Sequence, residues 1–264
     1  MLIDAANVAQ IMRDPRKPDA TTRPPAPTSI FAVTLRSDHR MRPFTIVFDL
    51  DGTLIDTAPD LVATLNVVLA REGLQPVAYA DGRLMVGGGV RVMVERGIKT
   101  NGRQLPAAEI DRLERDFIGY YAEHIAAHSQ PFQGVEATLD QLAASGYGLA
   151  VCTNKLEGLS LRLLDALKLR PRFRAICGAD TFGVSKPDPT ILNRTIERAG
   201  GDRTRAIMIG DSSTDIATAR AASIPVIAVD FGYTDIPVAE LKPDRVVSAF
   251  SELPEAISRV LSTG

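Results

Sequence analysis

Residues 44–54 read Phe-Thr-Ile-Val-Phe-Asp-Leu-Asp-Gly-Thr-Leu, and this stretch decides the fold. Its first seven residues are apolar almost without interruption, which is typical of a strand buried on both faces of a parallel sheet. Asp49 and Asp51 stand two positions apart, so both carboxylates lie on the same side of an extended chain. Such a pair is costly unless a cation lies between the two charges, and Gly52 permits a sharp turn after it. The stretch predicts a strand that ends at a site for a hard divalent metal ion with oxygen ligands.

Beyond residue 130, apolar strand-like stretches alternate with stretches of helical periodicity. Strands that alternate with helices of this length form βαβ units. We therefore expect an α/β fold whose core is a Rossmann-like, mostly parallel sheet. The further strands are expected at residues 147–153, 175–177, 205–210, 225–229 and 245–247, and helices at residues 135–144, at 156–167 and after Asp188.

The segment between the first two strands, residues 57–130, contains no convincing strand. Apolar residues recur at helical spacing in residues 61–69 and again in residues 110–120, and Thr57 with Asp60 resembles a capping box. An insert of about 70 residues is far longer than an ordinary crossover. We expect an α-helical cap domain over the carboxyl edge of the sheet, where open α/β sheets bind ligands. The expected domains are a core of residues 43–56 and 131–264 and a cap of residues 57–130.

Residues 1–42 differ from the rest of the chain. Five prolines lie between Met1 and Arg40, and Phe31 is the sole aromatic residue there. The segment lacks the apolar stretch of a secretory signal. We expect it to be a disordered N-terminal extension, or residues 1–40 to derive from an upstream start codon, with Met41 as the true start.

Composition excludes several classes of protein. The 264 residues carry 30 Lys and Arg against 32 Asp and Glu, a net charge of −2, whereas nucleic-acid binders are usually basic. The two cysteines, Cys152 and Cys177, exclude a disulfide scaffold and suit the reducing cytoplasm. No apolar run approaches the ~20 residues of a membrane-spanning helix. We expect a cytoplasmic protein, monomer or homodimer, with neither nucleic acid nor membrane as partner.

Polar residues also follow the later strands. Thr153 and Asn154 end the second strand, Lys186 follows the third in the run Lys-Pro-Asp-Pro, and Asp211 and Asp215 follow the fourth. Because the carboxyl ends of parallel strands meet at one edge of a sheet, these residues should join the first two aspartates in one cluster. Four carboxylates, a lysine, a hydroxyl and an amide suit phosphoryl transfer, where catalysis is largely positioning and charge stabilisation.

Taken in chain order, these residues resemble the four motifs of the haloacid dehalogenase-like hydrolase superfamily, over residues 44–230, and the insert resembles that superfamily's α-helical cap. The second aspartate favours a phosphatase or phosphomutase, because the dehalogenase branch lacks it. Other stretches resemble the phosphoglycolate phosphatase-like subfamily. They are residues 87–89, 128–135, 152–155 and 186–189.

The resemblance implies a role for each motif residue. Asp49 would be the nucleophile that forms an aspartyl-phosphate, and Asp51 the general acid and then the general base. Thr153 and Lys186 would bind the phosphoryl group and neutralise its charge. The implied cofactor is Mg²⁺, and the implied metal-site residues are Asp49, Asp51 through its carbonyl, Asp211 and Asp215, the last of which would support the metal or orient Lys186.

The expected function is hydrolysis of a small phosphomonoester, with 2-phosphoglycolate the first candidate. The alternatives are a phosphatase for pyrophosphate, a nucleotide or an amino-sugar phosphate, or a sugar phosphomutase. Asn154 and Arg91 are further candidates for substrate binding. Arg91 follows the glycine turn at residues 87–89 and either meets a substrate carboxylate or is a solvated helix charge. Lys155 either touches substrate or begins the next helix.

Two other features favour ordinary explanations. His124 and His128 have the spacing of one helix face, but the glutamate and third ligand of a zinc site are missing. Cys152 alternates with apolar neighbours and is expected to be a core side chain.

Overall fold

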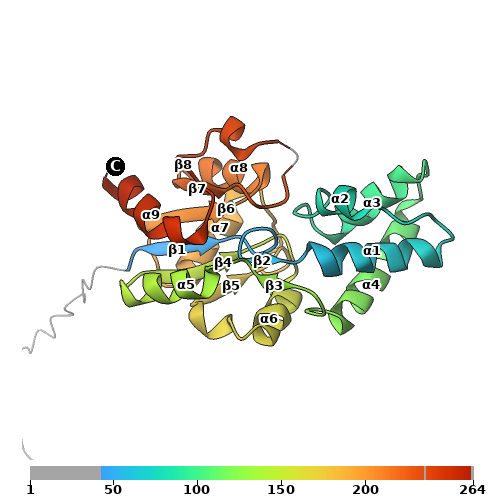
Figure 1. Cartoon of the computed structure of the whole chain (residues 1–264), viewed down its shortest axis with the longest axis horizontal. Coiled ribbons are helices and arrows are strands. Elements are labelled where there is room, and N and C mark those ends of the chain that lie inside the picture. Colours follow the sequence, from blue (N-terminus) through green and yellow to red (C-terminus); the bar gives the residue numbers. More distant parts are fainter. Residues whose placement is uncertain (1–42, 235, 263–264) are drawn as a thin grey trace, which may run out of the picture. The chain divides into compact units, whose positions relative to one another are not determined.

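A six-stranded sheet forms the centre of the structure, a computed structural model that describes residues 43–234 and 236–262. The expectations for residues 1–42 lie outside the described residues. Every neighbouring pair of strands is parallel, which confirms the α/β fold with a Rossmann-like sheet (Figure 1). Across the sheet the order is β5 (Ala175–Cys177), β4 (Gly148–Cys152), β1 (Thr45–Phe48), β6 (Ala206–Gly210), β7 (Val226–Val229) and β8 (Arg245–Val247).

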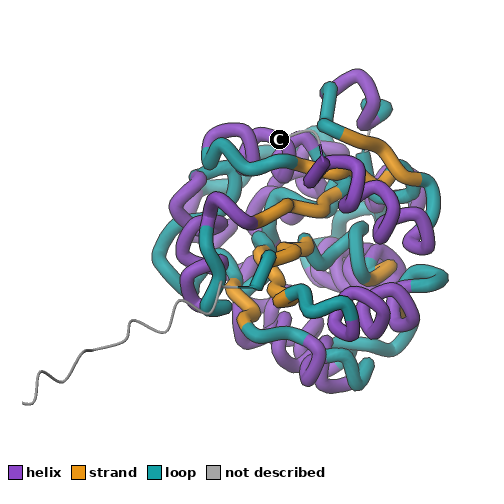
Figure 2. Tube along the Cα trace, turned by 90° about the vertical axis from the view of Figure 1, so that its left-hand side faces the viewer, coloured by secondary structure: helices purple, strands orange, loops and turns teal. Residues whose placement is uncertain are grey.

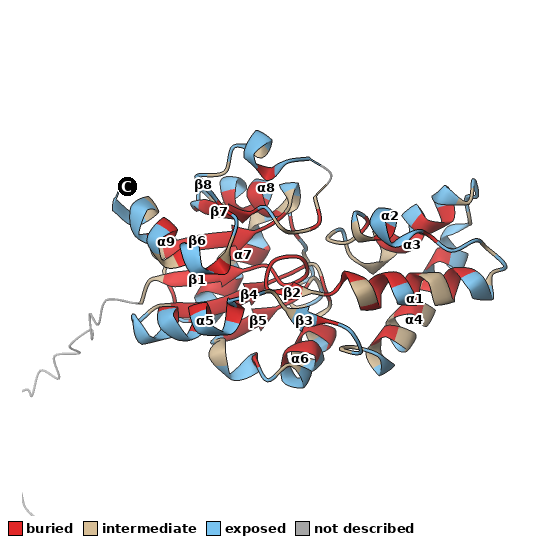
Figure 3. Ribbon diagram, in the orientation of Figure 1, coloured by how far each residue is buried: buried red, intermediate tan, exposed pale blue. Residues whose placement is uncertain are grey.

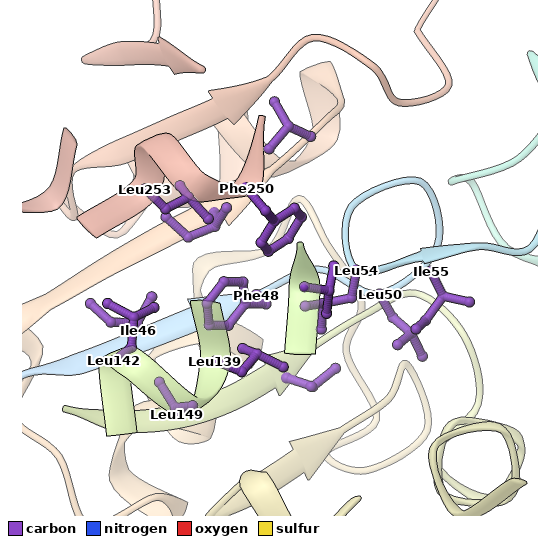
Figure 4. Packing of buried hydrophobic residues seen from close by; sticks show 14 of the residues in the cluster. Ile46, Phe48, Leu50, Leu54, Ile55, Leu139, Leu142, Leu149, Phe250 and Leu253 are labelled. Carbon is purple, nitrogen blue, oxygen red and sulfur yellow. The ribbon is translucent and has the colours of Figure 1, made fainter. Parts of the chain in front are cut away.

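Strand β1 lies at the middle of the sheet and is buried on both faces. Ile46 and Phe48 belong to one apolar cluster, whereas Val47 belongs to the other, as the alternation of a strand requires. Figure 4 shows Phe48 packed among Leu139, Phe250 and neighbouring side chains of the first cluster. Residues 44–50 are almost all apolar because both faces of the sheet are covered at this strand.

Helices cover both faces of the sheet. On one face lie α5 (Val135–Ala144), α6 (Glu157–Ala166) and α9 (Leu253–Ser262), and on the other lie α7 (Pro189–Arg198) and α8 (Ser213–Ala221). Their buried sides face the strands and their exposed sides point outward (Figure 3), and the tube in Figure 2 shows the helices around the strands. Short 3₁₀ helices occur at Arg170–Arg172, Arg203–Arg205, Val238–Leu241 and Phe250–Glu252.

A second group of helices lies beyond the carboxyl ends of the strands (Figure 1). It consists of α1 (Ala58–Arg71), α2 (Tyr79–Arg83), α3 (Val90–Thr100) and α4 (Ala107–Glu123). These helices share an apolar cluster of their own that includes Leu65, Phe117 and Tyr121. We call this group the cap. The sequence does not define the bounds of α2 and α3, because these helices have only 5 and 11 residues, which leaves little length for apolar periodicity.

The chain enters and leaves the cap through a two-stranded antiparallel pair, β2 (Ile55–Asp56) and β3 (Gln130–Pro131). Ile55 is paired with Pro131 and Asp56 with Gln130. Two residues per strand are too few to produce a periodic signal, so sequence patterning could not predict this pair.

The capping box expected at Thr57 and Asp60 is wrong. Thr57 is the N-cap of α1 but makes no capping bond, because its hydroxyl donates to Asp51 Oδ1 at 2.8 Å. Asp60 instead accepts bonds from the backbone amides of His128 and Ser129 and from the Ser129 hydroxyl. Its buried carboxylate therefore ties the start of the cap to its end.

The helix face expected for His124 and His128 is also wrong. Helix α4 ends at Glu123, with His124 as its C-cap, and His128 follows in an irregular segment. The ring Nδ1 of His124 donates to the Tyr120 carbonyl, 2.8 Å away. Within the described part of the chain, neither histidine belongs to a cluster of three metal-binding side chains.

The cysteines and the hydrophobicity of the helices can both be compared with the sequence-based expectations. Cys152 and Cys177 are free, buried thiols, and Cys152 is a core side chain as expected. Over residues 43–234 and 236–262, we find no helix with the length and apolar character needed to cross a membrane.

We predict that Asp60→Ala lowers the free energy of unfolding by about 3 kcal/mol, because it leaves the His128 amide and the amide and hydroxyl of buried Ser129 without their acceptor. Urea unfolding measures the change. The matched control is Asp81→Ala, which removes an exposed carboxylate from the cap and should change stability by less than about 0.5 kcal/mol. Equal effects of the two substitutions would contradict the role of Asp60.

Candidate active site

Lys186 lies at the centre of the polar cluster at the carboxyl edge of the sheet. Its Nζ is 2.7 Å from Asp49 Oδ1 and 2.6 Å from Asp215 Oδ1, and all three side chains are buried. Asp49 directly follows β1, Lys186 lies in the segment between β5 and α7, and Asp215 lies in the first turn of α8, the helix that follows β6. The structure thus brings together groups that the sequence placed at separate strand ends.

Asp211 is held in a close-fitting pocket of backbone. The Thr53 hydroxyl donates to its Oδ1 at 2.8 Å, and the Tyr233 amide donates to its Oδ2 at 2.8 Å. A Cβ on Gly52 or Gly232 would lie 2.5 Å or less from atoms of the Asp211 side chain. Gly52 also has φ of +85°, a conformation that favours glycine. Both glycines therefore let the backbone approach this carboxylate.

Asp215 accepts hydrogen bonds at both of its oxygens. Oδ2 accepts from the amides of Asp211 and Ser212 and from the Ser212 hydroxyl, which completes a capping box at the start of α8. Oδ1 accepts from Lys186. Of the two roles expected for Asp215, this arrangement favours orientation of the lysine.

Three carboxylates offer the ligands for a metal ion. One oxygen each from Asp49, Asp211 and Asp215 lies within 4.8 Å of the other two, and all three residues are buried. Burial is the main cause that raises the pKa of Asp49 to about 8 and that of Asp211 to about 7, and the neighbouring carboxylates add to it. A divalent cation would offset this repulsion, and oxygen donors suit a hard ion. The residues therefore fit a metal site.

The Asp51 side chain points to different partners. Its Oδ1 accepts from the Thr57 hydroxyl and is 3.0 Å from Lys155 Nζ. Lys155 Nζ also lies 4.6 Å from the centre of the Tyr121 ring, which comes from cap helix α4. Lys155 is only 7% exposed, and the nearby Asp51 charge raises its pKa although burial opposes it. The Asp51 carboxylate is thus paired with a lysine separate from the one that contacts Asp49.

A small cavity of about 30 Å³ lies between the core and the cap. Asn154 lines it and links both sides, because its amide nitrogen donates to the Gly87 carbonyl of the cap and its Oδ1 accepts from the Lys186 amide. Thr153 also lines it, and its hydroxyl accepts from the Lys155 amide at 3.1 Å. The charged and polar lining residues are Asp49, Asp51, Tyr121, Thr153, Asn154 and Lys155, and the others are Leu61, Val86, Gly87, Gly89, Val90, Met93 and Leu159.

Arg91 does not line this cavity. It lies at the start of α3, and its guanidinium pairs with Asp111 at 2.5 Å and with Glu95 and Glu114 at 3.3–3.4 Å. Its side chain is 41% exposed. This geometry fits the solvated helix charge better than contact with a substrate carboxylate.

Sequence reasoning missed Tyr233, which follows β7. Its amide donates to Asp211, its hydroxyl donates to Asp56 at 2.5 Å, and that hydroxyl accepts from the Ala58 amide. Tyr233 therefore connects the acidic cluster with the chain entering the cap. The rule that parallel strand ends meet at one edge would have indicated the segment after β7, but a tyrosine in that segment does not reveal contacts made through its amide and hydroxyl.

The haloacid dehalogenase-like hydrolase family model matches residues 46–229 of this chain. The phosphoglycolate phosphatase of Mesorhizobium japonicum is 53% identical over 208 residues, which cover 79% of this chain and 92% of the relative. The phosphoglycolate phosphatase of Caulobacter vibrioides is 46% identical over 225 residues, which cover 85% of this chain and 95% of the relative.

Solved structures are similar as well. The crystal structure of a protein described as a predicted phosphoglycolate phosphatase from Haemophilus somnus superposes with a TM-score of 0.76 at 29% identity. The similarity covers 81% of this chain and 97% of that one.

We predict that the metal-free protein loses stability as the pH rises from about 6 to about 8.5. The reason is that Asp49 and Asp211 have native pKa values near 8 and 7, above the ordinary 3.8, so the native state binds more protons than the unfolded state in this range. Removing one of these charges in Asp211→Asn should make the fall shallower. Thermal melts in EDTA across this range measure both proteins, and parallel curves would contradict the prediction.

Proposed function

Because this chain belongs to the haloacid dehalogenase-like hydrolase family, we propose that it is a phosphatase that converts 2-phosphoglycolate and water to glycolate and phosphate. The observation that carries the proposal is the buried Asp49–Lys186–Asp215 group, whose Asp49 lines the same cavity as Asp51. This arrangement supplies a nucleophile, a charge-neutralising lysine and a separate acid in one place.

Asp49 attacks the phosphorus atom and forms an aspartyl-phosphate, and the leaving oxygen departs on the opposite side. Lys186 holds the Asp49 carboxylate at 2.7 Å and offsets negative charge on the phosphoryl group. Thr153 lines the cavity, where its hydroxyl donates to a phosphoryl oxygen while it accepts from the Lys155 amide. These groups stabilise the transferring phosphoryl group through fixed hydrogen bonds.

Asp51 donates a proton to the leaving oxygen of the substrate and then accepts one from the water that hydrolyses the aspartyl-phosphate. Among the residues that the structure describes, the Thr57 hydroxyl and Lys155 Nζ both contact its Oδ1. Oδ2 is the oxygen available for proton transfer in the cavity.

Mg²⁺ is the proposed metal, which Asp49 and Asp211 would hold while Asp215 supports the site. Carboxylates and a substrate phosphate suit Mg²⁺, which keeps several of its waters. When bound, it supplies electrostatic stabilisation of the phosphoryl oxygens. The close approach of Gly52 and Gly232 fixes the Asp211 carboxylate for this role.

The proposed substrate is small. Relatives that are 46–53% identical to this chain are named phosphoglycolate phosphatase, and phosphoglycolate is a small phosphomonoester. We also propose a cytoplasmic location, since both cysteines are unpaired thiols.

We predict that the protein releases phosphate from 2-phosphoglycolate with a higher kcat/KM than from pyrophosphate, nucleotides or amino-sugar phosphates. Asp49→Asn keeps the shape of the nucleophile but removes its charge, so turnover should be lost, and Asp51→Asn should lower kcat by about 10²–10⁴-fold. A phosphate-release assay on this panel measures both. A different preferred ester would change the substrate alone, whereas rearrangement of a hexose 1-phosphate without phosphate release would indicate a phosphomutase.

We predict that Mg²⁺ raises the melting temperature, and does so more at about pH 8 than at about pH 6, because protons compete with the ion for the carboxylates. Scanning calorimetry with Mg²⁺ or EDTA measures the shift. Asp211→Asn serves as the control and should show little shift. An equal shift in that variant would mean that Mg²⁺ binds elsewhere.

A further inference from the structure

The proposed substrate has a second charged end. Besides its phosphate, 2-phosphoglycolate carries a carboxylate, and an enclosed site binds a carboxylate only where a cation or hydrogen-bond donors offset its desolvation. Nothing in the proposed chemistry assigns a partner to this end of the substrate. Arg91, the candidate from the sequence, pairs with three cap carboxylates and does not line the cavity.

Lys155 carries the one positive charge among the described residues that line the cavity. The other charged lining residues are Asp49 and Asp51, whose carboxylates would repel a substrate carboxylate. Lys155 is buried, and its Nζ stays charged because of its contact with Asp51. The cavity would therefore be unfavourable for a second anionic group without this lysine.

The Lys155 ammonium group has donors to spare. An ammonium group carries three N–H donors. One is directed to Asp51 Oδ1 at 3.0 Å, and the Tyr121 ring lies 4.6 Å away on the cap side. Lys155 can therefore keep its contact with Asp51 while it donates to a ligand in the cavity.

The start of helix α3 contributes to the same cavity. Gly89 and Val90, its N-cap and first residue, are lining residues. The first amides of a helix have no acceptor within the helix, and its N-terminal end carries partial positive charge. Lys155 from the core and the start of α3 from the cap thus line a space that favours an anion.

We propose that Lys155 is the specificity-determining residue that binds the substrate carboxylate, with the start of α3 as the second side of this subsite. The inference rests on the proposed phosphatase function and deepens it. It means that the enzyme selects small phosphomonoesters that bear a carboxylate next to the ester carbon. Esters of the same size with a neutral group there are poor substrates.

The test compares two substrates that differ only at this end, 2-phosphoglycolate and 2-hydroxyethyl phosphate. Lys155→Met should lower kcat/KM for 2-phosphoglycolate about 10²-fold more than for 2-hydroxyethyl phosphate, since a hydrogen bond to a charged group is lost with the first substrate alone. The loss should lie mainly in KM. Lys155→Arg keeps the charge and should retain part of the preference. Arg112→Met is the matched control, because it removes an exposed cap cation that pairs with Glu72.

The outcomes separate the two proposals. If wild type prefers 2-phosphoglycolate and folded Lys155→Met keeps that preference, the subsite is wrong and the phosphatase function stands. Equal losses with both substrates, mainly in kcat, would mean that Lys155 only positions Asp51 and would overturn the subsite. Loss of the preference in Arg91→Met would also overturn it. If wild type hydrolyses both esters equally, both the subsite and the proposed substrate fail, and if it hydrolyses no phosphoester, the proposed function fails.

Discussion

The contact of one buried ammonium group with two carboxylates determines how the rest of the site is built. Lys186 Nζ lies 2.6–2.7 Å from Asp49 and Asp215, and Asp211 stands nearby. Buried charges are tolerated only when they are paired and hydrogen-bonded. The capping box of α8, the Thr53 hydroxyl and the close-packed glycines all serve this requirement, because each fixes one carboxylate. The remaining negative charge is what makes the cluster suited to a cation.

Two lysines divide the acidic groups between them. Lys186 contacts the carboxylate proposed as nucleophile, whereas Lys155 contacts Asp51, the carboxylate proposed for proton transfer. Both aspartates follow β1 within three residues, and their separate partners give them separate environments. Lys186 pairs with carboxylates of the core, Asp49 and Asp215. Lys155 also faces Tyr121 of the cap, so the surroundings of the proton-transfer group depend on how the cap packs.

Sequence patterning predicted the parts of this structure that repeat or cluster. Long apolar strands and helices revealed the sheet, and the strand-end rule assembled Asp49, Lys186 and Asp211 before any geometry was known. It failed where a side chain has several possible partners. Thr57 and Asp60 have capping-box spacing, yet each bonds a group that is distant in sequence or outside the helix. For Lys155 the sequence left both substrate contact and a helix start open, since only tertiary packing buries it beside Asp51.

The pairing of β2 with β3 has a consequence for how such proteins diversify. Since Asp56 and Gln130 are directly opposed, the chain leaves the core and returns to it at one point. A hairpin with a two-residue turn can join two such strands. The cap can therefore be replaced as a unit. An insert of another length or composition can join β2 to β3 without altering the order or register of the central strands. The cap can thus vary in length and composition while the central strands keep their order.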